Sequence, residues 1–355
     1  MFEDLLRGWD GEEAAVRFDE PSQTWMFVCV HSTVLGPAMG GTRMKAYPTP
    51  HDALADGLRL SGAMTLKQAA ADLPYGGGKA VLAVPSVPTG DERRALLLRY
   101  GELVASLGGT YVTAADMNTR EADMDVVAER CPYVLGRSRA AGGAGDPGEG
   151  TATGVFHGLR ASARHAYGTD ELAGRTVLVQ GIGSVGSHLA ELLAHANATL
   201  LLADVDPERA KEAAGRLDAT AIDATAIDAD QVIGAECDIF APCATGGVLS
   251  AATIPKLRCR VVAGAANNQL VESRDAELLQ EAGILYAPDF VINAGGVIHL
   301  AGYETLGWTD EQMAARLAGI GDTLHEVFNS AERDGVSTDE AAQRLARARI
   351  DAALA

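Results

Sequence analysis

Glycines between a strand-like run and a helix-like run are the first residues that indicate a chemistry. Residues 176–186 spell TVLVQGIGSVG, with Gly181, Gly183 and Gly186 in the spacing G-x-G-x-x-G. The first glycine permits a tight turn, the second lets the backbone approach a pyrophosphate, and the third lets helix and strand pack closely. A helix beginning there offers its positive dipole end to phosphates. The pattern predicts a dinucleotide site; the alternative is a turn whose glycines serve packing alone.

An acidic residue at the end of the next strand-like run predicts which dinucleotide binds. Asp204 follows the run LLLA and stands 23 positions after Gly181. A carboxylate at this place accepts hydrogen bonds from both adenosine ribose hydroxyls and repels the extra phosphate of NADP. NAD is therefore the predicted cofactor. Asp206 and Arg209 follow closely, so some tolerance of NADP is left open.

Two lysines and a run of glycines indicate a second site. Residues 64–84 spell MTLKQAAADLPYGGGKAVLAV, in which Lys67 and Lys79 stand twelve positions apart and three glycines precede Lys79. A P-loop is excluded because Ala80 follows the lysine and a strand-like run comes next. A partly desolvated lysine can act as a base near neutral pH. Lys67 would supply a neighbouring charge and pair with a substrate carboxylate; the alternative is two solvated surface lysines.

Polar residues that follow strand-like runs are further candidates. Asp116 comes directly after such a run, where α/β folds collect their ligands, although a helix cap is an alternative role. Asn267 and Asn268 in GAANNQL follow another run, and amides there could bind a carboxylate or a nicotinamide amide. Asn293, in APDFVINAGGVI, could line a cleft.

These residues need strands and helices to position them, and the alternation of β-branched runs with helix-like runs favours parallel βαβ units. The predicted strands are 25–31, 79–85, 110–113, 176–180, 199–203, 237–241, 260–264 and 283–286. The predicted helices are 50–62, 91–107, 153–167 and 184–195, with further helices after Thr309.

A glycine-rich stretch, AAGGAGDPGEG at 140–150, predicts the boundary between two α/β domains. We expect residues 1–140 to form a substrate-binding and oligomerisation domain, joined by C-terminal helices at about 325–355. Residues 141–324 should form a doubly wound, Rossmann-type NAD domain with a parallel sheet, with a cleft between the two. The repeat ATAIDATAID at 219–228 is interpreted as a local duplication without function.

Composition excludes several classes of partner. The 355 residues carry 29 lysines and arginines against 48 acidic residues, a net charge of −19, so nucleic acid and anionic membrane surfaces are not expected partners. The five cysteines form no C-x-x-C pair, which argues against disulfides and a zinc site, and no metal is expected. With no signal-like start and no long apolar span, a cytoplasmic protein is predicted.

The motifs resemble those of the glutamate/leucine/phenylalanine/valine dehydrogenases, which are NAD(P)-dependent enzymes that reversibly deaminate L-amino acids. The resemblance extends from about Arg17 to Leu345. It is carried by the blocks LGPAMGGTRM, MTLKQAA, GGGKAV, TAADMNT, GGAGD, GIGSVG, APCATGG, GAANNQL and APDFVINAGG, which occur in this order.

The resemblance implies roles for individual residues. Lys67 would pair with the substrate α-carboxylate, Lys79 would be the catalytic lysine, and Asp116 the acid/base that handles the amine. Gly41 would bring backbone near the substrate, and Asn268 would bridge substrate and cofactor. The residues expected at the cofactor are Gly181, Gly183, Ser184, Val185, Gly186, Asp204, Thr153, Ala244 and Asn268.

The same resemblance implies a mechanism. Hydride leaves the substrate Cα for the nicotinamide and gives an imino acid. Lys79 then activates water to attack the imine carbon, while Asp116 moves protons to and from the departing ammonia. The products are a 2-oxo acid, NADH and ammonium.

The residues expected around the substrate side chain are apolar: Met39, Met64, Ala114, Val291 and Val297. The blocks WDGE, RFD, LSGAMTLK and DMNT are similar to actinobacterial phenylalanine dehydrogenases, so L-phenylalanine is the expected substrate. Ala114 and Val297 favour the alternative, a branched-chain (leucine, valine or isoleucine) dehydrogenase. A non-catalytic NAD-binding regulator is a remote third reading. The family also implies a homo-oligomer.

Overall fold

The computed structural model describes residues 2–218, 224–227 and 229–355, and the repeat at 219–228 lies largely outside the described residues. The chain divides into two compact units. Unit 1 comprises Met1–Asp146, Leu300–Gly307 and Ala346–Ala355, and unit 2 comprises Pro147–His299 and Trp308–Leu345. Of the terminal region 325–355 that the sequence assigned to the first domain, only the last ten residues belong to unit 1.

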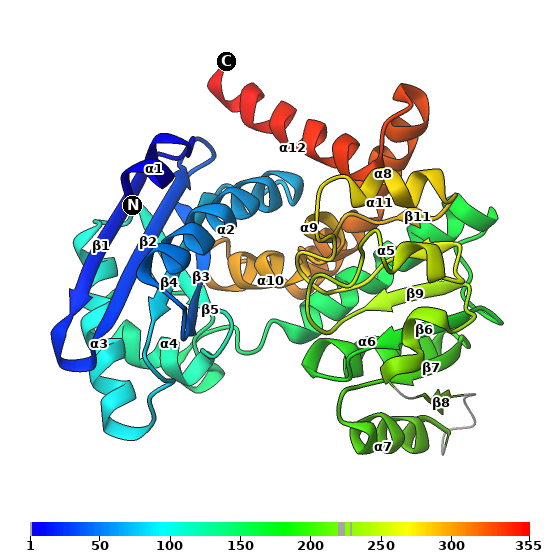
Figure 1. Ribbon diagram of the computed structural model, residues 1–355, viewed down its shortest axis with the longest axis horizontal. Coiled ribbons are helices and arrows are strands. Elements are labelled where there is room, and N and C mark those ends of the chain that lie inside the picture. The colour runs from blue at the N-terminus through cyan, green and yellow to red at the C-terminus, as the bar shows by residue number, and fades with distance from the viewer. Residues whose placement is uncertain (1, 219–223, 228) are drawn as a thin grey trace. The chain divides into compact units, whose positions relative to one another are not determined.

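Unit 1 is built around a mixed sheet. Its strands are β1 (Glu13–Asp19), β2 (Thr24–Ser32), β3 (Ala38–Lys45), β4 (Gly76–Ala83) and β5 (Tyr111–Ala115). Their order is β1-β2-β4-β3-β5, with β2 antiparallel to both of its neighbours, β1 and β4, and β3 parallel to both β4 and β5 (Figure 1). The parallel βαβ arrangement that the sequence favours therefore does not extend to β1 and β2. A short 3-10 turn, Glu20–Ser22, joins them, and so short a connection can only join antiparallel strands.

Helices cover both faces of this sheet (Figure 1). They are α1 (Phe2–Arg7), α2 (Pro50–Ala70), α3 (Gly90–Ser106) and α4 (Glu121–Ala128). α2 begins where the Thr49 hydroxyl caps the backbone N–H of Asp52 and Pro50 occupies the first turn. It continues eight residues beyond the predicted end at Gly62, so Lys67 lies on a helix.

Alternate residues of β2 belong to the two opposite faces of the sheet, and each face packs against different helices. Phe27 and Cys29 pack with Leu54 of α2, whereas Met26 and Val28 point to the opposite face, into the core that α3 and α4 contribute to. Successive residues of a strand point to opposite faces of its sheet. The unit is thus a three-layer α/β/α sandwich, with each face of the sheet buried.

Unit 2 contains a parallel sheet of six strands among the described residues. They are β6 (Thr176–Gln180), β7 (Thr199–Ala203), β8 (Ala224–Ala226), β9 (Ile239–Pro242), β10 (Val261–Val262) and β11 (Leu285–Tyr286). Their order, β11-β10-β9-β6-β7-β8, is the doubly wound arrangement of dinucleotide-binding folds. The predicted strands 176–180 and 199–203 are confirmed at both ends, whereas the last three strands are shorter than predicted.

The helices that begin or lie within unit 2 are α5 (Gly148–Tyr167), α6 (Ser184–His195), α7 (Pro207–Asp218), α8 (Asp275–Glu281), α9 (Asp289–Ile292), α10 (Gly295–Glu304), α11 (Asp310–Asp334) and α12 (Thr338–Leu354). The predicted helix 184–195 is confirmed as α6. In the part of the chain that the structure describes, none of the helices has the length and apolarity needed to cross a membrane.

Candidate active site

The α2-facing side of the unit 1 sheet collects the candidate residues of this unit. Lys79 stands two positions before Val81, which packs with α2, so the two side chains share a face of β4. On β3, Thr42 and Met44 contribute to the opposite face, which leaves Met39, Gly41 and Arg43 on the α2 side. Ala114 of β5 pairs with Gly41 in register and shares its face.

A buried lysine and a partly buried carboxylate, Lys79 and Asp116, form an ion pair on this face. The Lys79 Nζ lies 2.8 Å from Oδ2 of Asp116, and the lysine is 5% exposed. Lys79 is therefore not a solvated surface lysine. Asp116 follows β5 directly and α4 begins only at Glu121, so the alternative role of Asp116 as a helix cap is excluded as well. The catalytic roles of both residues stay predictions.

Arg43 is a functional candidate that sequence reasoning missed. Its Nε lies 3.2 Å from the same Oδ2 of Asp116, and its Nη1 lies 2.9 Å from Oδ2 of Asp56 on α2. The Tyr47 hydroxyl donates to that Asp56 oxygen at 2.7 Å, and Arg59 pairs with the other oxygen at 2.9 Å. Charges of alternating sign thus run from Lys79 to Arg59, and buried charges are tolerated when they are paired in this way.

These cations set the protonation state of Asp116. Burial alone would favour the neutral acid, but the neighbouring Lys79 and Arg43 lower the pKa of the Asp116 carboxyl below its ordinary value. Asp116 is therefore an anion at neutral pH, able to accept a proton. Lys79 and Arg43 both contact Oδ2 of Asp116. This geometry allows the other carboxylate oxygen, Oδ1, to accept a further hydrogen bond.

Removing the charge of Arg43 should move the pH dependence of activity. In Arg43→Gln, one of the two cations that lower the Asp116 pKa is lost while its burial persists, so the pKa rises. The acidic limb of the kcat/KM profile should then shift to higher pH, and kcat should fall by about 10- to 100-fold because Asp116 loses its orientation. Arg59→Gln is the matched control, since Arg59 contacts Asp56 from solvent and does not contact Asp116. An acidic limb that stays in place would contradict this role for Arg43.

The glycines of unit 1 allow close backbone approach. A Cβ on Gly41 would lie 2.8 Å from Cβ of Asp116 and 2.6 Å from the Ala115 carbonyl oxygen, so only glycine lets β5 place Asp116 here. A Cβ on Gly77 would lie 2.1 Å from the Thr65 backbone nitrogen, and one on Gly78 would lie 2.7 Å from the Tyr111 ring. Gly77 therefore allows α2 to pack closely on the sheet, and Gly78 leaves room for Tyr111 on the opposite face.

Other predicted substrate residues of unit 1 lie on α2 and on the strands that it covers. Lys67 and Met64 lie in the last two turns of α2 and are both half-buried. Met39 on β3 and Ala114 on β5 are 1% and 5% exposed, so both belong to the core of this face. Unit 1 thus contributes two lysines, one carboxylate and apolar surface on one side of its sheet.

The glycine loop of unit 2 lies at the point where the strand order reverses. Gly181 has a φ of 95°, and a Cβ on it would lie 2.8 Å from Ala244, which follows β9. A Cβ on Gly186 would lie 1.9 Å from the Gly181 carbonyl oxygen, whereas Gly183 faces open space. Ligands of doubly wound sheets bind at this switch point between β6 and β9. If these glycines served packing alone, a Cβ on Gly183 would meet neighbouring atoms. It meets none within 4 Å.

The start of α6 and the carboxylate of Asp204 fit the pyrophosphate and the adenosine ribose of a dinucleotide. Ser184 and Val185 form the first turn of α6, where backbone N–H groups point toward a phosphate. Asp204 follows β7, and its two oxygens accept the N–H groups of Ile182 at 2.7 Å and Asp206 at 2.9 Å. These bonds fix the carboxylate, which retains lone pairs for ribose hydroxyls. Arg209 lies 3.4 Å from it.

Two loops that follow β9 and β10 pack together in unit 2. The Asn268 carbonyl oxygen accepts the N–H of Gly247 at 2.8 Å, and Asn268 has a φ of 51°, a conformation that asparagine tolerates better than most residues. The Asn293 amide donates to Oδ1 of Asn267 at 2.9 Å, while its own buried Oδ1 has no hydrogen-bond partner among the described residues. An unsatisfied buried oxygen is typical of a site that binds a ligand donor.

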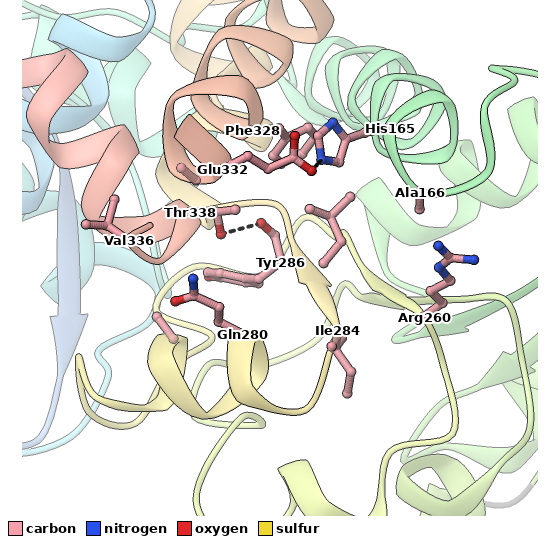
Figure 2. A pocket seen from close by; sticks show the side chains of 14 residues that line it. His165, Ala166, Arg260, Gln280, Ile284, Tyr286, Phe328, Glu332, Val336 and Thr338 are labelled. Carbon is pink, nitrogen blue, oxygen red and sulfur yellow. Dashed lines mark hydrogen bonds and ion pairs between the residues drawn. The ribbon is translucent and has the colours of Figure 1, made fainter. Parts of the chain in front are cut away.

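The remaining predicted residues of unit 2 are also placed. Val291 in α9 is buried, and Val297 in the first turn of α10 is half-buried. Thr153 lies on α5, and its hydroxyl donates to the Glu149 carbonyl at 3.0 Å. None of the predicted site residues lines the pocket shown in Figure 2, which is bounded by the ends of α5 and α11, by α8 and by β11.

Comparisons with known proteins agree with this geometry. A family model described as the Glu/Leu/Phe/Val dehydrogenase dimerisation domain matches residues 20–133, and the model of the Glutamate/Leucine/Phenylalanine/Valine dehydrogenase matches residues 142–207 and 202–355. The chain belongs to the Glu/Leu/Phe/Val dehydrogenase family. The resemblance inferred from the sequence blocks is thereby confirmed.

Relatives within the Glu/Leu/Phe/Val dehydrogenase family match nearly the whole chain. A leucine dehydrogenase from Thermoactinomyces intermedius is 42% identical over 98% of this chain and 93% of its own. A valine dehydrogenase from Streptomyces virginiae is 44% identical, over 96% and 93%. The crystal structure of an L-tryptophan dehydrogenase from Nostoc punctiforme is 37% identical, with a TM-score of 0.83, and the match covers 100% of this chain and 99% of that one. This protein is an amino acid dehydrogenase.

Proposed function

We propose that this enzyme catalyses the NAD-dependent, reversible oxidative deamination of branched-chain aliphatic L-amino acids to 2-oxo acids and ammonium. The observation that carries the proposal is the ion pair between buried Lys79 and Asp116, which Arg43 also contacts, on the sheet face that α2 covers. The similarity to leucine and valine dehydrogenases supports the branched-chain alternative better than the phenylalanine preference expected from the sequence.

The residues of unit 1 divide the chemistry between them. Lys67 pairs with the α-carboxylate of the substrate, and Met39, Met64 and Ala114 contribute apolar walls for its side chain. The 2.8 Å distance between Lys79 Nζ and Asp116 Oδ2 lies within the range for direct proton transfer. A proton moved to Asp116 leaves Lys79 as an amine that activates water against the imine carbon. Asp116 then returns a proton to the departing ammonia.

The residues of unit 2 would hold the cofactor. The first turn of α6 binds the pyrophosphate, Asp204 binds the adenosine ribose, and Thr153, Ala244 and Asn268 lie toward the nicotinamide. When bound, the nicotinamide supplies the two-electron oxidant. Val291 and Val297 are the apolar residues of unit 2 that we assign to the substrate side chain. The description of residues 20–133 as a dimerisation domain supports a homo-oligomer.

A panel of amino acids tests the substrate preference. NAD reduction is followed by absorbance with L-leucine, L-valine, L-isoleucine and L-phenylalanine. We expect the highest kcat/KM with a branched-chain substrate, and a disadvantage of phenylalanine of about 10- to 200-fold, which corresponds to ~1–3 kcal/mol in an apolar pocket. A higher kcat/KM for phenylalanine would overturn the branched-chain proposal and leave the reaction type intact.

Asp204 should determine the choice between NAD and NADP. Asp204→Asn removes the negative charge that repels the 2′-phosphate while it keeps the size of the side chain. The ratio of kcat/KM for NAD to that for NADP should fall by about 10- to 100-fold. Glu208→Gln is the control, because Glu208 is an exposed acid on α7 that pairs with Lys211. The assignment fails if the ratio in Asp204→Asn equals that of the unmodified enzyme.

A further inference from the structure

Cys237 and Cys259 occupy paired positions on adjacent parallel segments of unit 2. Bridges on either side of them, Glu236 with Arg258 and Ile239 with Val261, share the same offset of 22 residues (258 − 236 and 261 − 239). The Cα atoms of paired residues on neighbouring strands lie about 5 Å apart and their side chains point to the same face. A disulfide spans Cα distances of about 4.4–6.8 Å.

The two thiols are close enough to interact. Their interaction lowers the pKa of the Cys259 thiol while it raises that of Cys237. The other three cysteines behave differently, because burial raises the pKa of the thiols of Cys29, Cys131 and Cys243. Cys237 and Cys259 therefore differ from the other three thiols in having a second thiol as a neighbour.

Cys259 is the more accessible thiol of the pair, because Cys237 is buried. Cys259 is partly exposed and stands between two exposed arginines, Arg258 and Arg260. Arg260 lies at the pocket of Figure 2, and its guanidinium lies 5.3 Å from the centre of the Tyr167 ring. Access to solvent is a feature of reactive cysteines.

We propose that Cys237 and Cys259 form a redox-active dithiol that a peroxide converts into an intrachain disulfide. The Cys259 thiolate attacks one peroxide oxygen, the O–O bond breaks, and sulfur loses two electrons as Cys259 sulfenic acid forms. The Cys237 sulfur then attacks the Cys259 sulfur, the S–O bond breaks, and the hydroxide leaves as water with the proton from Cys237. Two thiols and one hydrogen peroxide thus give one disulfide and two waters.

The disulfide lies away from the cofactor end of the sheet. Both cysteines precede β9 and β10, whereas Ala244 and Asn268 follow the carboxyl ends of these strands. We therefore expect oxidation to leave turnover unchanged. Because the bond closes a loop and restricts the unfolded chain, the oxidised protein should melt a few degrees higher, on the order of 2–4 °C.

Thiol counting on the native, full-length protein tests the proposal. After treatment with hydrogen peroxide, the number of thiols titrated in denaturant should fall from five to three and return to five with a reducing agent. A peptide map without reduction should contain a cross-linked peptide that joins Cys237 to Cys259. Retention of all five thiols, or loss of thiols without this cross-linked peptide, would overturn the proposal.

Single substitutions separate the two steps. Cys237→Ser should stop at the Cys259 sulfenic acid, which a dimedone probe traps, and should show no rise in melting temperature. Cys131→Ser, at a buried cysteine outside the pair, should still lose two thiols. Trapping of sulfenic acid at Cys29 or Cys131 in place of Cys259 contradicts the assignment. Since thiols and peptides are measured directly, the result is independent of the proposed substrate.

Discussion

Lys79→Ala is expected to lose about 10²–10⁴-fold in kcat/KM for L-leucine, the range that a positioned acid–base group contributes. The substitution removes the only side chain that we assign to the activation of water and leaves Asp116 with Arg43 as its cationic partner. The loss should appear mainly in kcat, because Lys67 still binds the substrate carboxylate. Initial rates of NADH formation over a range of leucine concentrations measure both parameters.

Two controls keep this prediction about Lys79 interpretable. Lys256→Ala removes an exposed lysine of unit 2 and should leave the rates unchanged. Because removal of one partner of a buried ion pair destabilises a protein by about 3–5 kcal/mol, the variant's fold is checked by the binding of NADH and by circular dichroism. A folded Lys79→Ala enzyme with undiminished kcat would show that Lys79 has no part in the chemistry.

Asp116→Asn is expected to lower kcat by a similar factor, about 10²–10⁴-fold, because an amide of the same shape cannot accept the proton from Lys79. The substitution also leaves Lys79 and Arg43 close together with no carboxylate between them. We therefore expect lower stability at neutral pH, measured by urea unfolding. Asp351→Asn, at an exposed acid near the end of α12, is the control.

The pH dependence of this second prediction has a definite sign. Because the pKa of Asp116 is lowered from its ordinary value of 3.8, its carboxylate stabilises the fold fully above that value, and the stabilisation is lost as the pH falls through the lowered pKa. The stability difference between the unmodified enzyme and Asp116→Asn should stay constant near neutral pH and shrink only below about pH 4. A difference that shrinks at higher pH would contradict the lowered pKa.

Much of unit 2 was predictable because local signals and packing agree there. The run 176–180 is apolar and β-branched, and Gly181 and Gly186 are required both by the turn and by the contact between helix and strand. The last strands were predicted too long because β10 and β11 pair over only two residues each. The apolar run that surrounds them continues into loops that are buried without strand pairing.

The sequence was less informative about unit 1. β1 and β3 contain charged residues and glycines in place of an apolar run, so periodicity did not indicate strands there. β3 carries Arg43, whose role depends on a carboxylate thirteen positions away on α2 and another that follows β5. Such pairing is fixed by tertiary structure alone. One signal in the sequence could have indicated the role of Arg43. The block LGPAMGGTRM otherwise predicts burial, and a buried arginine needs a carboxylate partner.

The most direct test of the account is product formation by the unmodified enzyme with L-leucine and NAD. We predict that NADH, ammonium and the 2-oxo acid of leucine appear in equal amounts, and that the reaction runs backward when the 2-oxo acid, ammonium and NADH are supplied. Absence of turnover with every amino acid of the panel, by an enzyme that still binds NADH, would contradict the proposed deamination. It would favour a non-catalytic nucleotide-binding role.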